Sequence, residues 1–195
     1  MSLELKKGVE FKKELIPQGS YSARIYEIIE LGTIEGYKGK QQRKVRITFE
    51  LPTEKKVFKS ENGEQPLVIS KEYTVSSHEK SGMRELVEAC IAIGLFQGEA
   101  DTFDIKQLMG ETCLVSIKHK EGEKGKFQYV DNTSALPKGL KVEKAINKTR
   151  TYEIDTHDKD VFSALPQFVQ DKITSSEEYQ EKYGMTISAD DVPFD

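Results

Sequence analysis

Basic and aromatic side chains are interleaved between residues 24 and 129 of this 195-residue chain. Lys and Arg neutralise phosphates and aromatic rings stack on bases, so together they form a typical surface for single-stranded nucleic acid. The candidate residues are Arg24, Tyr26, Tyr37, Lys38, Lys40, Arg43, Lys44, Arg46, Lys71, Tyr73, Lys118, Lys120, Lys126, Phe127 and Tyr129. Tyr37 is the strongest stacking candidate, because Gly36 and Lys38 flank it in a connection. An alternative role for Phe49, Phe127 and Tyr129 is to fill the interior of a barrel.

A short acidic peptide with a Pro-Phe pair, Ala189 to Asp195, ends the sequence. Aspartates beside an aromatic make a poor core segment but a good ligand. A partner protein can seat the Phe ring in an apolar pocket and bind the carboxylates with Arg or Lys. We therefore predict a partner-binding tip made of Asp190, Asp191, Val192, Pro193 and Phe194.

The two signs of charge are segregated along the chain. Residues 151–195 hold three Lys and eleven acidic residues, a net charge of −8, whereas residues 1–150 hold 26 basic and 22 acidic residues, a net charge of +4. A basic body with an acidic tail indicates that the body binds an anion. The tail then either binds a basic partner or competes for the body's own groove, the alternative being chance clustering on a solvated surface.

Motifs for catalysis or metal binding are scarce. Gly39-Lys40 lacks the spacing of a phosphate-binding loop, and the three histidines lack partners at ligand spacing. Asp155 to Asp160 offers acidic groups for a divalent ion, as in a nuclease, but a solvated acidic linker fits better. We therefore predict no enzyme, no catalytic residue, no metal site and no cofactor.

The sequence also bears on location. Its longest apolar run, Ala89 to Phe96, is far shorter than the roughly 20 residues of a membrane helix, and Met1 to Phe11 does not resemble a signal peptide. Cys90 and Cys113 lie in apolar contexts, which is typical of buried free thiols in a reducing compartment. We expect a cytoplasmic protein with no membrane partner.

These residues need strands to position them. Alternation and β-branched content predict strands over residues 21–31, with a bulge near Glu27, then 43–51, ended by Pro52, and 67–75. Two more strands are expected over residues 112–119 and 126–131. Between the third and fourth, apolar residues at helical spacing from Met83 to Ile91 predict a helix, with Ser81 as N-cap and Gly94 as its stop. A short helical turn is expected over residues 105–109.

The order of three strands, a helix and two strands is that of an OB-fold, a five-stranded Greek-key barrel. A generic α+β sheet covered by one helix is the alternative. In OB-folds the face of the second and third strands, the first connection and the loop between the last strands form the binding groove. We expect the barrel in residues 1–150. Residues 151–195 are expected to form an acidic segment with a short helix over 160–169, a capping box at 175–178 and a helix end near Gly184.

Two stretches resemble known families. Asp190 to Phe194 is similar to the acidic tip of bacterial and phage single-stranded DNA-binding proteins, although Ala189 replaces an acid and Asp195 follows the aromatic. Residues 71–81, 103–113 and 136–139 resemble small phage replication proteins with an OB-type core. The resemblance implies a sequence-tolerant single-stranded DNA-binding protein of phage replication or recombination, located in the host cytoplasm. It also implies recruitment of replication or repair proteins through the tip, and homo-oligomers are compatible with it.

Two other functions stay open at this point. One is a protein-interaction module, an adaptor or an inhibitor whose acidic tail mimics nucleic acid. The more distant one is a nuclease that uses the acids near His157.

Overall fold

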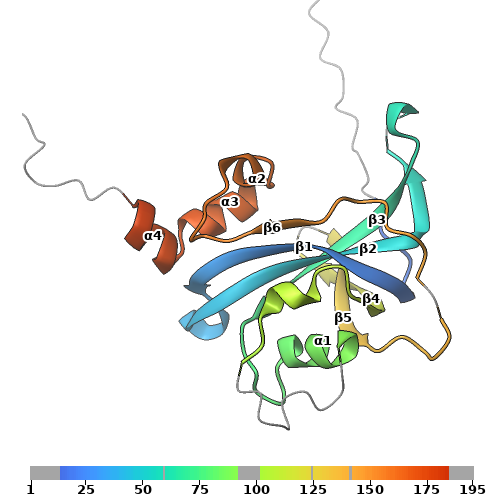
Figure 1. Ribbon diagram of the computed structural model, residues 1–195, viewed down its shortest axis with the longest axis horizontal. Helices are drawn as coiled ribbons and strands as arrows, with labels where there is room; N and C mark the ends of the chain where they lie inside the picture. The colour runs from blue at the N-terminus through green and yellow to red at the C-terminus, as the bar shows by residue number, and fades with distance from the viewer. Residues whose placement is uncertain (1–13, 59, 92–101, 124, 141, 185–195) are drawn as a thin grey trace, which may run out of the picture.

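The structure, a computed structural model, describes residues 14–58, 60–91, 102–123, 125–140 and 142–184 (Figure 1). Its strands are β1 (Gly19–Glu35), β2 (Gln41–Val57), β3 (Glu64–Thr74), β4 (Thr112–Gly122), β5 (Gly125–Ser134) and β6 (Arg150–Tyr152). Its α-helices are α1 (Gly82–Cys90), α2 (Lys159–Ser163), α3 (Gln167–Thr174) and α4 (Glu177–Tyr183), and 3-10 helices are η1 (Tyr37–Gly39), η2 (Ser60–Asn62) and η4 (Ile105–Leu108). The protein is therefore mainly β, as predicted.

The six strands form one sheet in the order β3-β2-β1-β4-β5, with β6 paired to β1. All pairs are antiparallel except β1 with β6. β1 is the central strand, since it pairs with β2 along one edge and with two strands along the other. On that second edge β4 pairs with Gly19–Arg24, and β6 pairs with β1 from Glu27 onward. The predicted bulge near Glu27 is confirmed by the register shift between Ile25 and Glu27.

The main core lies between the sheet and α1. It contains the inward-pointing residues of the strands, such as Ile47 and Phe49 of β2, and the apolar residues along one face of α1. The predicted N-cap of α1 is confirmed, since Ser81 Oγ accepts a hydrogen bond from the Arg84 N–H at 3.1 Å. Gly94, its predicted stop, lies outside the described residues.

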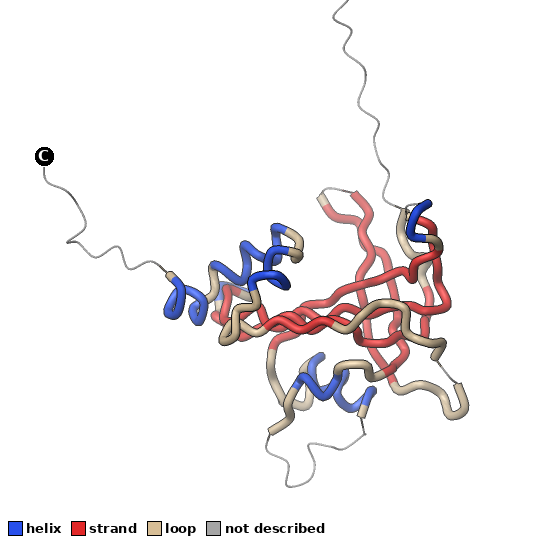
Figure 2. The backbone as a smooth tube through the Cα atoms, turned by 45° about the horizontal axis from the view of Figure 1, so that its top comes forward, coloured by secondary structure: helices blue, strands red, loops and turns tan. Residues whose placement is uncertain are grey.

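A second, smaller core joins the C-terminal helices to the far half of β1. It contains Ile29, Leu31, Ile34, Tyr152, Ile154, Leu165, Val169 and Ile173. Figures 1 and 2 show that α2, α3 and α4 lie on the other side of the sheet from α1. Residues 150–184 thus pack on the body rather than extending from it, and the predicted boundary at 150/151 falls inside β6.

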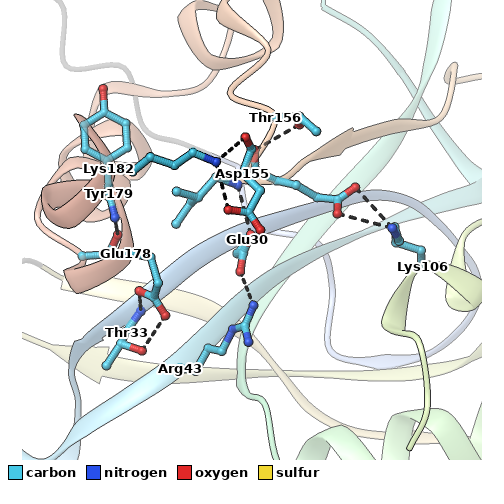
Figure 3. A network of polar contacts seen from close by, with 12 residues as sticks. Glu30, Thr33, Arg43, Lys106, Asp155, Thr156, Glu178, Tyr179 and Lys182 are labelled. Carbon is cyan, nitrogen blue, oxygen red and sulfur yellow. Dashed lines mark hydrogen bonds and ion pairs between the residues drawn. The ribbon is translucent and has the colours of Figure 1, made fainter.

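Polar contacts fix this second core along its rim, as Figure 3 shows. The Glu178 carboxylate of α4 accepts hydrogen bonds from the N–H and hydroxyl of Thr33 in β1, at 2.6 and 2.8 Å. Lys182 of α4 donates to the backbone oxygen of Asp155 at 2.7 Å. The predicted cap of this helix shifts by one residue, since Ser176 is its N-cap, and the helix ends before Gly184 as predicted.

Three expectations need correction. Among the described strands no ladder joins β3 to β5, so the sheet is open and six-stranded and a closed five-stranded barrel is not shown. Three C-terminal helices are present, because two helices, α2 and α3, replace the single short helix expected over residues 160–169. Pro52 does not end the second strand, because a register shift between Leu51 and Lys55 accommodates the proline, and β2 runs on to Val57.

Candidate nucleic-acid interface

Basic and aromatic residues meet on one face of the β4–β5 hairpin. Lys118 lies directly opposite Tyr129, and Lys120 lies directly opposite Phe127. Side chains of opposed residues in an antiparallel pair point to the same face. Since Ile117 points into the core, this face points outward. The hairpin therefore presents two lysines beside two aromatic rings.

The two rings lie close together and reach solvent. Their centroids are 6.3 Å apart with a tilt of 51°, and Phe127 is 45% exposed. Phe127 and Tyr129 therefore do not fill the interior, unlike Phe49, which is fully buried. Neighbouring rings that reach solvent, here an exposed Phe127 and a half-buried Tyr129, are a suitable platform for bases.

The cations of this hairpin are accessible. Lys118 forms an ion pair of 2.7 Å with Asp131, whose hydrogen bond and charge raise the pKa of Lys118. Such an exposed pair contributes little to stability, so a phosphate can replace Asp131 as the partner. Lys120 and Lys126 are exposed and make no ion pair with any described residue. Lys126 lies opposite Glu121, so its side chain points to the other face of the hairpin.

The outer face of β1 and β2, which carries the predicted residues Arg24 and Arg46, is partly covered. Arg24 forms a 2.6 Å ion pair with Glu50, and the same arginine donates to the backbone oxygen of Asn147 at 2.9 Å. Glu50, which has no exposed surface, also accepts the N–H groups of Ile146 and Asn147 at 2.8 and 3.2 Å. Residues 146 and 147 therefore cross the outer face of both strands. The Arg24 side chain is bound by Glu50 and Asn147 and is not free to bind a phosphate.

Two neighbouring contacts extend this cover. Glu27, also buried, pairs with Arg150 and accepts a 2.8 Å hydrogen bond from Thr48. Arg46 lies under the ring of Phe168 and 4.0 Å from Glu72. Of the predicted residues on this face, only Lys44 makes no ion pair within the described chain, and it is half-buried.

Lys71 and Tyr73 do not belong to an outer binding face. They lie on the inner side of β3, opposite Ile47 and Val45. Tyr73 is 3% exposed, and burial raises its pKa. Lys71 donates to the backbone oxygen of Asp131 at 3.2 Å and lies 5.2 Å from the Tyr73 ring centroid, and burial lowers its pKa. The pair links β3 to β5 and gives no access to a base.

Tyr26 occupies the bulge of β1 and borders a hollow of about 610 Å³. Residues 147–151 line most of the rest of it, together with Asp158 and Val161. Burial, followed by the charge of Glu27, raises the pKa of Tyr26 to about 12, so its hydroxyl stays protonated at neutral pH.

The first connection folds as η1. Lys38 and Gly39 have positive φ values of 59° and 70°, which a tight turn requires and which glycine adopts easily. The side chain of Tyr37 lies outside the described residues. Lys40 is exposed, whereas Arg43 forms a 2.6 Å ion pair with Glu30 that raises its pKa (Figure 3).

The acids once considered for a divalent ion have other roles. Asp155 pairs with Lys182 at 3.1 Å, and Asp158 caps α2 through the N–H groups of Asp160 and Val161. Among the described residues, no group of three or more His, Cys, Asp or Glu side chains is arranged to hold a metal. The same part of the chain has no helix of the length and apolarity needed to cross a membrane.

Residues 190–194, the predicted partner-binding tip, lie outside the described residues. No protein-family profile and no curated protein matches this chain.

The sequence predicted a short helix over 160–169 that packs on the barrel or on a partner, but not that residues 146–150 cover β1 and β2. Glu27 and Glu50 occupy positions that point away from the main core, where charged residues are usual. The sequence around them does not show that a segment 96 or more residues later buries them. Phe168, an apolar residue in a polar segment, was a weak indication that this segment contacts the body. In the structure its exposed ring lies above Arg46.

Proposed function

We propose that this protein is a non-enzymatic, sequence-tolerant single-stranded DNA-binding protein. The observation that carries the proposal is the outer face of the β4–β5 hairpin, where Lys118 and Lys120 stand beside Tyr129 and Phe127. Rings bind bases by stacking without regard to sequence, and lysines bind the phosphates between them.

An OB-type fold is part of the proposal. The strand order β3-β2-β1-β4-β5 and the position of α1 between β3 and β4 in the chain support it. The Lys71 contact with the Asp131 backbone brings β3 near β5, as closure of a small barrel requires. In such folds the loop between the last two strands is part of the nucleic-acid site.

The biological setting follows from the sequence resemblances and belongs to the same proposal. The protein coats DNA exposed during phage replication or recombination, and Asp190 to Phe194 recruit replication or repair proteins. The segregated charges fit this division, with a basic body for DNA and an acidic end for proteins.

Titration of a fluorescent oligo-dT with the full chain tests the proposal. Binding at micromolar protein or below in low salt supports it. Absence of binding there, together with a tight complex with a protein partner, favours an interaction module instead. Cleavage of the oligonucleotide on addition of Mg²⁺ would indicate a nuclease.

A further inference from the structure

Helix α3 places an exposed aromatic ring above the outer face of β2. Phe168 is 51% exposed, and its ring centroid lies 5.1 Å from the guanidinium carbon of Arg46. Arg46 therefore covers one side of the ring, while half of the side chain remains open to solvent.

Anchoring of α3 does not explain this placement. The segment is held by Leu165, Val169 and Ile173, which recur every four residues and are buried in the second core. Phe168 and Lys172 lie on the adjacent stripe of the helix, at the same spacing, and contact β2 and β3 instead. An exposed ring on that stripe buries little apolar area, so packing alone gives it a small role.

The charged residues of this face are the basic Arg46, Lys44 and Lys172 and the acidic Glu72, with Asp171 three residues after Phe168 on α3. Lys172 pairs with Glu72 at 2.6 Å, and Arg46 lies 4.0 Å from the same carboxylate. Lys172 and Arg46 thus share one carboxylate. Lys44 is a third basic residue on the same outer face of β2, two residues before Arg46. A phosphate beside the ring meets an excess of positive charge.

We propose that Phe168 is a second stacking site for single-stranded DNA, supplied by α3 and backed by Arg46. The inference rests on the proposed function, and it extends the site beyond the β4–β5 hairpin. A base stacks on the open side of the ring, and Arg46, Lys44 and Lys172 bind adjacent phosphates. The C-terminal segment that covers part of the expected groove thereby contributes to binding.

Single-tryptophan reporters test this directly, because the chain contains no Trp. Phe168→Trp reports on the new site, and Phe127→Trp reports on the hairpin. Phe58→Trp is the matched control, since Phe58 is 62% exposed and directly follows the end of β2 at Val57. Figure 1 shows that this end of β2 lies away from α3. Each full-length variant is titrated with oligo-dT, and base stacking is followed as quenching of the Trp fluorescence.

The expected result is quenching at positions 168 and 127 and none at 58. Quenching at 127 without quenching at 168 overturns this inference and leaves the proposed function intact, whereas no quenching at either position contradicts both. As a second measurement, Phe168→Ala weakens oligo-dT binding by about fivefold or more, the loss of one stacked base. An unchanged affinity in a variant whose melting temperature is also unchanged counts against the site.

Discussion

Lys120 of β4 lies directly opposite Phe127 of β5, on the outward face of the hairpin. Two residues away along each strand, Lys118 and Tyr129 repeat the same pairing of a cation with a ring. The regular strand geometry therefore sets the spacing between charges and rings, and no loop has to be ordered to form the surface.

Replacing either ring of the hairpin should weaken DNA binding. Phe127→Ala and Tyr129→Ala each remove a stacking surface worth about 1–3 kcal/mol. Phe58→Ala, at another exposed Phe, should leave affinity unchanged. Fluorescence anisotropy with oligo-dT measures the effect, and circular dichroism confirms the fold. Wild-type affinity in both ring variants would move the site away from this hairpin.

The lysines should govern the dependence on salt. Lys118→Gln and Lys120→Gln each remove one phosphate contact, so the slope of log K against log salt becomes less steep by about 0.7 per variant. Lys106→Gln, at a lysine of η4 outside the proposed sites, is the control and should leave the slope unchanged. A slope unaltered by the hairpin substitutions argues that these lysines do not contact phosphates.

The buried carboxylate Glu50 should be essential for stability. Glu50→Ala leaves Arg24 without its partner and the N–H groups of Ile146 and Asn147 without their acceptor. We expect a loss of about 3–5 kcal/mol in the free energy of unfolding, as for other broken buried pairs. Urea denaturation measures the loss, and the exposed Glu61→Ala is the control. A change below about 0.5 kcal/mol would show that the segment does not depend on this contact.

Docking of α4 should weaken in acid. Burial opposes ionisation of Glu178, but hydrogen bonds from Thr33 and the charge of Arg43 outweigh it, so its pKa is lowered in the folded protein. A lowered pKa stabilises the fold above the unfolded value, about 4.3, and this contribution disappears as the pH falls through the folded value. The stability difference between the wild type and Glu178→Gln should therefore be present at pH 7 and smaller at pH 3, below the unfolded value.

Urea midpoints at both pH values measure that difference. Glu181→Gln, on the exposed side of the same helix, should show no such pH dependence. If Glu178→Gln differs from the wild type in stability by the same amount at pH 7 and pH 3, the charge of Glu178 does not contribute to the docking of α4.

Much of the fold was predictable because its signals are local. Alternation in β2 and β4 placed Ile47 and Ile117 inward, and helical spacing with the Ser81 cap placed α1. β6 was missed because three residues carry no periodicity, and only the edge of β1 beyond Arg24 makes Arg150–Tyr152 a strand.

The site was predictable in part. The sequence placed Lys118, Lys120 and Lys126 around one hairpin without assigning faces, and the register now puts Lys118 and Lys120 on one face. The sequence could not show that Arg24 and Arg46 face residues from the end of the chain. Long-range cover of this kind depends on tertiary packing, which a single sequence does not display.

The most direct test of DNA binding is a titration of fluorescent oligo-dT with the full-length protein at two salt concentrations. We predict a dissociation constant in the micromolar range or below at low salt, with a steep loss of affinity as salt rises. No binding at micromolar protein in low salt would contradict the central claim.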